Sequence, residues 1–206
     1  MTDWKEIGVV RGDDGRRRCG WCISADDYMA YHDDEWGRPV DDDVRLYEKL
    51  SLEGFQSGLS WLTILRKREG FRRAFAGFDP ERVARFKERD VLRLLDDAGI
   101  VRHRGKIEAT IANARATLQA QEEHGSLAAL VWSHAPTRRM RAPRRLGDIA
   151  SVTDESRALA KSLKRVGFQF VGPTTAYAAM QSLGLVNDHM VGCWVRTACA
   201  EERAAV

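Results

Sequence analysis

The stretch that decides the fold of this chain is GFQFVGPTTA, residues 167–176. Gly167 and Gly172 frame a short hairpin between two segments that read as helices. Pro173 suits the first turn of the second helix, where a missing N–H costs nothing. Backbone N–H groups beside a helix N-terminus are suited to bind one phosphate. The stretch is therefore compatible with a helix-hairpin-helix that carries an anion site, although the glycines alone favour an ordinary helix-helix turn.

Outward from this hairpin, nearly every segment has the apolar spacing of a helix. Residues 134–149, which contain two prolines and five arginines, read as a loop instead. No run reads as a convincing strand, so we predict an all-α fold. The expected helices cover residues 42–55, 60–68, 80–86, 90–99, 106–121, 127–132, 151–166, 173–183 and 188–200.

Two helix starts carry specific signals. Asp79-Pro80 looks like an N-cap followed by proline at the first helical position. Asp90 is expected to cap the next helix, which should stop at Gly99. Leu92 and Leu95 are expected to face inward in that helix.

The 206 residues suffice for one substantial domain or two small lobes. No apolar run is long enough to span a bilayer, and residues 1–18 lack the apolar stretch of a secretion signal. We therefore expect a cytoplasmic protein without a membrane partner.

The net charge is only +3, but basic residues gather locally. Such clusters favour a phosphate-rich partner, with solvated surface as the alternative for each one. The clusters are Arg102, Arg104 and Lys106; Arg138, Arg139, Arg141, Arg144 and Arg145; and Lys161, Lys164 and Arg165.

Two cysteines and two histidines have the composition of a metal site. Cys19 and His32 lie near the start of the chain, and His189 and Cys193 lie near its end. Two sulfur and two nitrogen donors suit a tetrahedral structural zinc. The four-residue spacing would place His189 and Cys193 on one face of a helix. The two pairs can meet only if the chain ends come together, so the pattern predicts a metal-stapled globule.

A further cysteine leaves a second possibility open. Cys19-Gly-Trp-Cys22 is a Cys-x-x-Cys motif, which is a redox or zinc motif in its own right. Cys22 could therefore replace Cys19 as a ligand or remain a free thiol.

Seven blocks of the sequence together point to a known family. They are CGW at 19–21, YHDDEWG at 31–37, LEG at 52–54, GLSW at 58–61, DAGIVRHRGK at 97–106, GFQFVG at 167–172 and VNDHMVGC at 186–193. With these blocks in this order, the chain resembles the 3-methyladenine DNA glycosylase I family of the helix-hairpin-helix DNA glycosylase superfamily.

The resemblance implies an all-α helix-hairpin-helix bundle whose termini are joined by one structural zinc per chain. Residues 1–18 would be a flexible basic extension, residues 19–200 a single glycosylase domain of two helical lobes, and residues 201–206 a tail. The ligands at the family positions would be Cys19, His32, His189 and Cys193.

The resemblance also implies an activity. A monomeric enzyme of this family would hydrolyse the N-glycosidic bond of 3-methyladenine in double-stranded alkylated DNA and release the free base. Removal of 3-methylguanine, more slowly, is a further possibility. Asn187 stands where many superfamily members have an aspartate, and Thr174 stands where bifunctional members have a lysine, so no strand-cutting step is expected.

The resemblance also nominates residues that would hold a flipped base. Aromatic rings attract a flat cation by stacking and cation–π interaction, although core packing is the commoner role for such residues. Glu53 would contact the base edge and assist bond cleavage, with an exposed carboxylate near a helix end as the alternative. The aromatic candidates are Trp21, Tyr28, Tyr31, Trp36 and Trp61.

The DNA contacts are expected from two further segments. Gly58 and Leu59 could form an apolar wedge that fills the gap left by the flipped nucleotide, with core packing of Leu59 as the alternative. The grip on the phosphate backbone is expected from Lys164, Arg165, Gly167, Gly172 and Thr174.

Two rival interpretations come from other functional classes. One is a non-catalytic helix-hairpin-helix module that binds DNA, against which Glu53 and the aromatic set argue. The other is a thiol oxidoreductase built on Cys19 and Cys22, which lacks the βαβ context of that motif.

Overall fold

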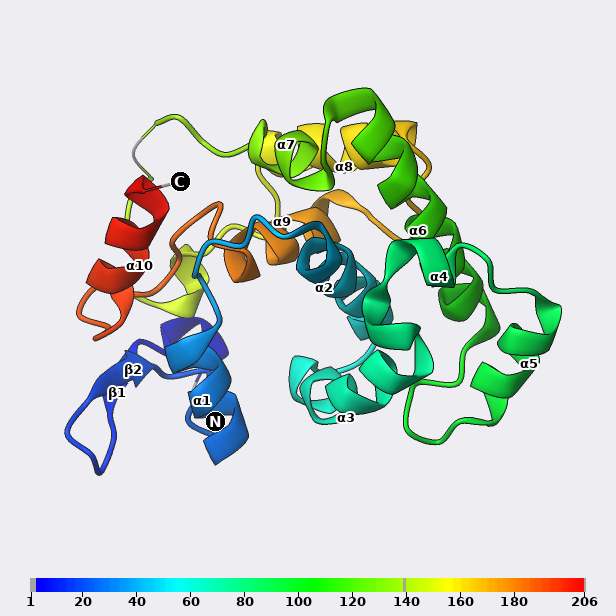
Figure 1. Ribbon diagram of the computed structural model, residues 1–206. Coiled ribbons are helices and arrows are strands. Elements are labelled where there is room, and N and C mark those ends of the chain that lie inside the picture. Colours follow the sequence, from blue (N-terminus) through cyan, green and yellow to red (C-terminus); the bar gives the residue numbers. More distant parts are fainter. Residues whose placement is uncertain (1–2, 139, 206) are drawn as a thin grey trace. The chain divides into compact units, whose positions relative to one another are not determined.

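A computed structural model describes residues 3–138 and 140–205, and these residues are mostly helical (Figure 1). The finding confirms the prediction of a mainly helical fold. The chain divides into two compact units, and each is described here by itself. Unit 1 takes the described residues of Met1–Val40, Ala135–Thr153 and Met180–Val206, and unit 2 takes those of Asp41–His134 and Asp154–Ala179.

Unit 1 contains the only two strands in the described part of the chain, which the sequence pattern did not predict. The strands pair antiparallel with Val9 opposite Cys19. The turn between them is closed by Gly15, whose positive φ of 77° suits glycine. The elements of unit 1 are β1 Val9–Arg11, β2 Arg17–Cys19, α1 Asp26–Asp34, α10 Arg196–Ala204 and the 3-10 helices Trp4–Glu6 and Leu146–Asp148.

The predicted domain boundaries fall inside elements of this unit. Both strands lie at or before residue 19, within or beside the expected flexible extension, and α10 runs through residue 200. Residues 1–2 and 206 of the expected extension and tail lie outside the described residues. The flexibility of residues 1–18 stays a prediction.

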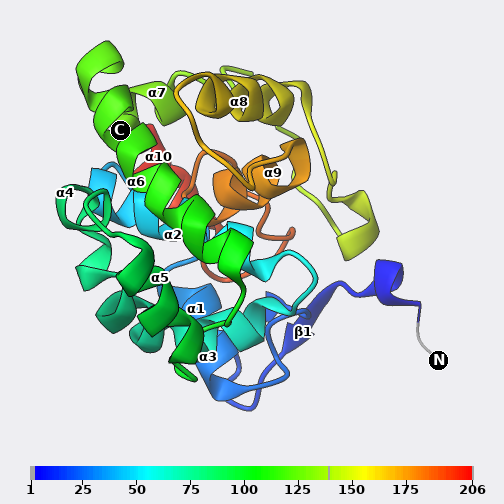
Figure 2. The same cartoon turned by 90° about the vertical axis from the view of Figure 1, so that its right-hand side faces the viewer.

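Unit 2 is built around α6, a continuous helix that packs against α2, α4, α5 and α7 (Figure 2). The fully buried side chains of this core include Tyr47, Phe55, Phe71 and Ile107. The helices of the unit are α2 Asp43–Gln56, α3 Trp61–Ala74, α4 Pro80–Val83, α5 Glu88–Asp96, α6 Arg104–His124, α7 Leu127–Trp132, α8 Asp154–Arg165 and α9 Pro173–Ser182, the last of which ends in unit 1.

Side-chain caps explain where several of these helices begin. The side chains of Asp42, Ser60, Asp79 and Ser126 each accept a hydrogen bond from a backbone N–H in the first turn of the following helix. The prediction for Asp79 and the proline after it is thus confirmed.

The predicted start of α5 is wrong. Lys87 occupies the N-cap position, and Asp90 lies three residues later, where its carboxylate accepts from the Lys87 N–H at 2.9 Å. This register turns Leu92 outward, with 51% of its surface exposed, and buries Val91 and Leu94 instead. The helix also ends at Asp96, before Gly99.

Among the described residues, no helix is both long enough and apolar enough to cross a membrane.

Candidate functional site

Unit 1 gathers the four predicted metal ligands into one buried group. Cys19 ends β2, His32 lies on α1, and His189 and Cys193 lie in the segment before α10. The ligand atoms of all four lie within 4.8 Å of one another. The sequence prediction that these residues meet is therefore confirmed.

The distances in this group fit a tetrahedral ion. His32 Nε2 lies 3.2 Å from His189 Nδ1 and 3.4 Å from Cys193 Sγ. His189 Nδ1 lies 3.6 Å from Cys193 Sγ and 3.9 Å from Cys19 Sγ. With Zn–S near about 2.3 Å and Zn–N near about 2.0 Å, the edges of a zinc tetrahedron are about 3.3 to 3.8 Å long. The donor set and its spacing therefore suit zinc.

The protonation of the group also suits a metal. Hydrogen bonding with Cys19 lowers the pKa of the Cys193 thiol, although burial acts in the opposite direction. Burial alone would lower the pKa of His32, but its hydrogen bonds to Cys193, Cys22 and Asp33 raise it to about 10. A thiolate and a neutral imidazole are the forms that bind a metal, so metal binding to this group would release protons.

Each histidine is oriented by a hydrogen bond from its outer ring nitrogen. His32 Nδ1 lies 2.8 Å from the Asp33 carboxylate, and His189 Nε2 lies 2.8 Å from the Trp36 carbonyl oxygen. These bonds direct Nε2 of His32 and Nδ1 of His189 toward the sulfur atoms, as is usual for metal-binding histidines. Nothing in the sequence distinguishes Asp33 from Asp34 beside it, so Asp33 is not among the predicted site residues.

Asp33 is itself held by a buried network. Arg18 donates to it from Nε at 3.0 Å and from the terminal guanidinium at 2.8 Å, and Trp194 Nε1 donates at 3.1 Å. Burial would raise the pKa of Asp33, but the bonds from Arg18, His32 and Trp194 lower it. The carboxylate is therefore a fixed anion behind the His32 ring.

The helix predicted over 188–200 begins only at Arg196, so His189 and Cys193 do not share a helix face. The segment turns instead: Cys193 N–H donates to the Met190 carbonyl at 2.9 Å, and Gly192 has a φ of 86°. The side chain of Asn187 accepts from the His189 N–H and donates to the Arg196 carbonyl, which holds a non-helical turn before α10. Asn187 therefore shapes the ligand loop.

Cys22 lies outside the four-donor group. It is buried, and its thiol donates to the Cys19 carbonyl oxygen at 3.1 Å. Its position favours Cys19 as the ligand, as the family pattern does.

The four aromatic candidates of unit 1 form one cluster that adjoins the ligands. The ring centroid of Trp21 lies 5.0 Å from that of Tyr28 and 5.1 Å from that of Trp36. Tyr28 and Tyr31 lie three residues apart on α1, and the centroids of their stacked rings are 6.5 Å apart. Trp36 also meets the His189 ring edge-on at 4.7 Å. The four candidate metal ligands therefore contact this aromatic cluster through Trp36 and His189.

Glu53 and Trp61, the remaining pocket candidates, belong to unit 2. Glu53 lies on α2 and is only 5% exposed, so it is not the exposed carboxylate of the alternative interpretation. Trp61 begins α3 and is also buried. Lys49, one helical turn before Glu53, places its Nζ 3.7 Å from Glu53 Oε1 and 3.8 Å from the centroid of the Trp61 ring.

The loop between α2 and α3 presents Leu59 to solvent. Leu59 is 41% exposed, so it is not a core residue of unit 2, and Gly58 before it has a φ of 82°. Lys106 of α6 donates to the carbonyls of Phe55 and Ser57 at 2.8 and 2.6 Å. This buried ammonium holds the last turn of α2 and the start of the loop.

The sequence suggested that Lys106 belongs to a solvent-facing basic cluster, but its side chain is buried and does not belong to one. Burial lowers its pKa, and its hydrogen bonds go to backbone carbonyls. Arg104 and Arg145, from two of the basic clusters, form ion pairs with Glu88 and Glu6 respectively. Local charge counts thus overstated the basic surface.

The predicted hairpin connects α8 to α9. Gly167 has a φ of 106°, and the N–H groups of Gly167 and Phe168 donate to the carbonyls of Lys164 and Leu163, which is a Schellman ending of α8. Lys164, Arg165 and Thr174 are exposed around it.

The tip of the hairpin has a feature that the sequence did not reveal. Phe170, not Gly172, has positive φ, at 52°, and its side chain is 47% exposed. Its Cβ lies 3.5 Å from the place where a Cβ on Gly54 would stand. The tip of the hairpin therefore packs at ordinary contact distance against α2 next to Glu53.

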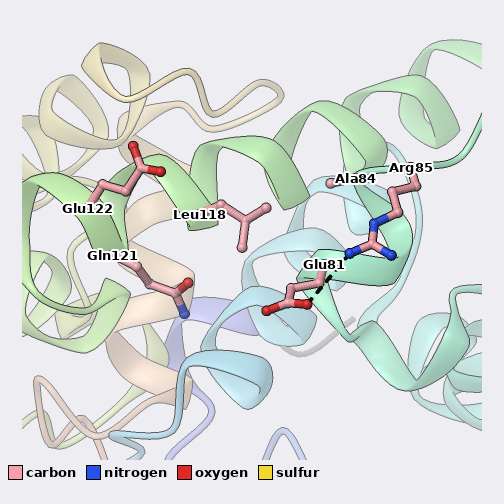
Figure 3. Close-up of a pocket in the computed structure, with 6 residues that line it drawn as sticks. All are labelled: Glu81, Ala84, Arg85, Leu118, Gln121 and Glu122. Atoms are coloured by element: carbon pink, nitrogen blue, oxygen red, sulfur yellow. Dashed lines mark ion pairs between the residues drawn. The ribbon is translucent and has the colours of Figure 1, made fainter.

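A hollow elsewhere on unit 2 contains none of the candidate residues (Figure 3). It has a volume of about 620 Å³ and is open to solvent. An ion pair between Glu81 and Arg85 crosses part of it at 3.7 Å. Its lining has no aromatic ring to stack on a base: Glu81, Ala84, Arg85, Leu118, Gln121 and Glu122.

The chain is similar in sequence to two named DNA glycosylases. The chain is 51% identical over 179 residues to DNA-3-methyladenine glycosylase 1 of Escherichia coli (strain K12), covering 85% of this chain and 95% of that protein. It is 42% identical over 183 residues to DNA-3-methyladenine glycosylase of Haemophilus influenzae (strain ATCC 51907 / DSM 11121 / KW20 / Rd), covering 87% and 98%.

A crystal structure of a variant of 3-methyladenine DNA glycosylase I in complex with 3-methyladenine is also similar. Its TM-score is 0.83 at 34% sequence identity, over 87% of this chain and 97% of that one. The model of a protein family described as methyladenine glycosylase matches residues 21–197. This match takes in most of the sequence, and the chain belongs to the methyladenine glycosylase family.

Proposed function

We propose that this protein is a monofunctional DNA glycosylase that hydrolyses the N-glycosidic bond of 3-methyladenine in double-stranded alkylated DNA, as a step of base excision repair. Relatives that share up to 51% of its sequence bear the name of this activity. The observation that carries the proposal is the buried carboxylate of Glu53 on α2, whose neighbour Lys49 also lies over the Trp61 ring.

The reaction begins with extrusion of the damaged nucleotide, because the base is inaccessible inside a duplex. Alkylation at N3 makes the base cationic and weakens its glycosidic bond, so recognition matters more than strong acid catalysis. Glu53 accepts hydrogen bonds from the base edge and favours a cation over neutral adenine. Water is the nucleophile, and Glu53 is the catalytic residue in this scheme.

Aromatic side chains take part in base recognition in this proposal. In unit 2 the candidate is Trp61, and in unit 1 the candidates are Trp21, Tyr28, Tyr31 and Trp36. Each ring face that meets the cationic base contributes roughly 0.5–2 kcal/mol. The four rings of unit 1 form a cluster in which neighbouring ring centroids lie 5.0 to 6.5 Å apart, and this supports a shared role.

The DNA is held by the hairpin and by an apolar wedge. Lys164, Arg165, Thr174 and the backbone between Gly167 and Gly172 contact phosphates near the flipped nucleotide. Leu59, exposed on its Gly58 turn, enters the base stack to fill the gap. The proposed product complex is an abasic strand and free 3-methyladenine, bound by a monomer.

A structural zinc is part of the proposal. Cys19, His32, His189 and Cys193 would hold it, and four protein donors leave no position for a reactive water. Its contribution is to cross-link β2, α1 and the loop before α10. The aromatic cluster contacts the proposed zinc site through Trp36, which packs against His189 and accepts its hydrogen bond.

The absence of a strand-cutting step follows from Thr174, whose hydroxyl cannot form a Schiff base with the sugar. The alternative function, a non-catalytic DNA-binding module, would need no buried carboxylate beside an aromatic ring.

The test is release of bases from methylated double-stranded DNA, resolved by chromatography. We expect 3-methyladenine to appear without strand cleavage, and Glu53→Gln to slow its release by at least about tenfold, the cost of about 1.4 kcal/mol. Glu48→Gln is the matched control, because Glu48 is a buried carboxylate on the same helix, paired with Arg72. No release by the unaltered protein, with retained DNA binding, would favour the binding module.

A further inference from the structure

An internal cation lies between the two groups of unit 2 that are proposed to recognise the base. Lys49 Nζ is 3.7 Å from Glu53 Oε1 and 3.8 Å from the centroid of the Trp61 ring. The side chain is 13% exposed, so these contacts are largely shielded from water. A carboxylate and the face of an indole are the two protein groups that attract a flat cation most strongly. Lys49 therefore already makes the interactions assigned to an alkylated base.

We propose that Lys49 occupies the cation position of the base site in the free protein, yields it to the cationic base, and returns to expel the product. The inference rests on the proposed function. It makes Lys49 a specificity-determining residue. A neutral base cannot displace the Lys49 ammonium from the carboxylate of Glu53, whereas an alkylated base can, because it also carries a positive charge.

The charge balance of the reaction gives the exchange its direction. The nucleotide enters with one positive charge on its base. When the C1′–N9 bond breaks, both bonding electrons go to N9, and the base becomes neutral. The sugar carbon takes the hydroxyl group of water, and the remaining proton of the water passes to solvent. The site thus loses its cation at the moment of cleavage, and Glu53 can again pair with the ammonium of Lys49.

The helix geometry allows this exchange without movement of the backbone. Lys49 and Glu53 are four residues apart on α2, so their side chains share one face. The four-carbon stem of lysine can swing its ammonium away from the Trp61 ring by rotamer changes alone.

The test compares Lys49→Met, which removes the charge but keeps the length of the side chain, with Lys49→Arg, which keeps a cation. Lys87→Met is the control, because Lys87 is exposed in the same unit and its loss changes the net charge equally. Two quantities are measured for each: the inhibition constant of free 3-methyladenine, and the single-turnover rate of base release from methylated DNA.

Lys49→Met is expected to bind free 3-methyladenine roughly three- to tenfold more tightly, because the neutral base no longer competes with an ammonium. Its single-turnover rate should exceed that of the unaltered protein, because the cationic base no longer has to displace an ammonium. Lys49→Arg and Lys87→Met should keep the original inhibition constant. Lys49→Gln gives the same comparison if Lys49→Met is not recovered folded.

An inhibition constant unchanged in both Lys49→Met and Lys49→Gln would overturn the inference, and weaker binding of free 3-methyladenine would show that Lys49 contacts the base directly. These outcomes differ from failure of the proposed function, in which the unaltered protein itself releases no base.

Discussion

Asn113 holds the backbone of Gln169 by both ends of its side-chain amide. Its Nδ2 donates to the Gln169 carbonyl at 3.2 Å, and its Oδ1 accepts from the Gln169 N–H at 2.7 Å. Asn113 is buried on α6, so a rigid helix of unit 2 fixes the hairpin just before its exposed tip at Phe170. The conformation of the hairpin thus depends on a residue far from it in the sequence.

Replacing Asn113 by leucine should weaken DNA binding. The change keeps the approximate size of the side chain but removes both hydrogen bonds to the backbone of Gln169. Their loss should destabilise the ordered conformation of the hairpin by about 1–3 kcal/mol. We expect the affinity for abasic-site duplex DNA to fall by roughly tenfold, with a shallower salt dependence. Gln119→Leu, an exposed change on the same helix, is the control. Equal affinities for the two variants would contradict a positioning role.

Local signals in the sequence predicted much of unit 2. The N-caps and the prolines that begin α4 and α9 act on neighbouring residues, so their effect can be read directly along the chain. The spacing of His189 and Cys193 was less informative, because a tight turn and a helical turn both bring residues four apart together. Asn187 and Gly192 decide between them through conformations that the pattern of ligands does not reveal.

Long-range contacts account for what the sequence could not provide. Lys106 lies among arginines in the sequence, yet it is buried against carbonyls about fifty positions earlier in the chain. Lys49 has no distinguishing neighbours in the sequence, and its contact with Trp61 becomes visible only once α2 and α3 pack together. Most of the site residues that the sequence predicted lie within motifs. Lys49 and Asn113, which it did not predict, contact those motifs from elsewhere in the chain.

Lys106→Met should destabilise the protein and its wedge loop. The change leaves two carbonyls at the end of α2 without their donor, at a cost of about 1–3 kcal/mol. For a chain of this size we expect the thermal midpoint to fall by roughly 2–12 °C. Arg102→Met, an exposed change nearby in the sequence, should leave the midpoint unchanged. If both variants have the same thermal midpoint as the unaltered protein, Lys106 does not anchor this loop.

Leu59→Ala should impair excision but not folding. Because Leu59 is 41% exposed, its truncation removes little buried surface and should change the free energy of unfolding by less than about 0.5 kcal/mol. The affinity for abasic-site DNA should nevertheless fall, since less apolar surface fills the stack. Binding and thermal melts on the same preparation separate the two effects. A lower melting point with unchanged DNA affinity would favour a packing role.

Asp33→Asn should weaken zinc binding without removing a ligand. The amide cannot fix the His32 ring as the carboxylate does, and loss of such a partner lowers metal affinity roughly 10–100-fold. Competition with a chromophoric chelator measures the affinity directly. Asp34→Asn, the exposed neighbour, is the matched control and should bind zinc normally. Equal affinities would mean that the buried contacts of Arg18 and Trp194 orient Asp33 for some purpose other than the metal site.

Metal content should distinguish the two cysteines of the Cys-x-x-Cys motif. Cys19 Sγ lies in the group of four donors, whereas the Cys22 thiol points to the Cys19 carbonyl oxygen. We therefore expect Cys19→Ser to lose zinc and to melt at a lower temperature, because β2 and α1 are no longer joined to the loop before α10. Cys22→Ser should retain about one zinc per chain, since a hydroxyl can keep the hydrogen bond of the thiol. The reverse pattern, with zinc lost only from Cys22→Ser, would reassign the ligand and with it the path of the chain between β2 and Trp21.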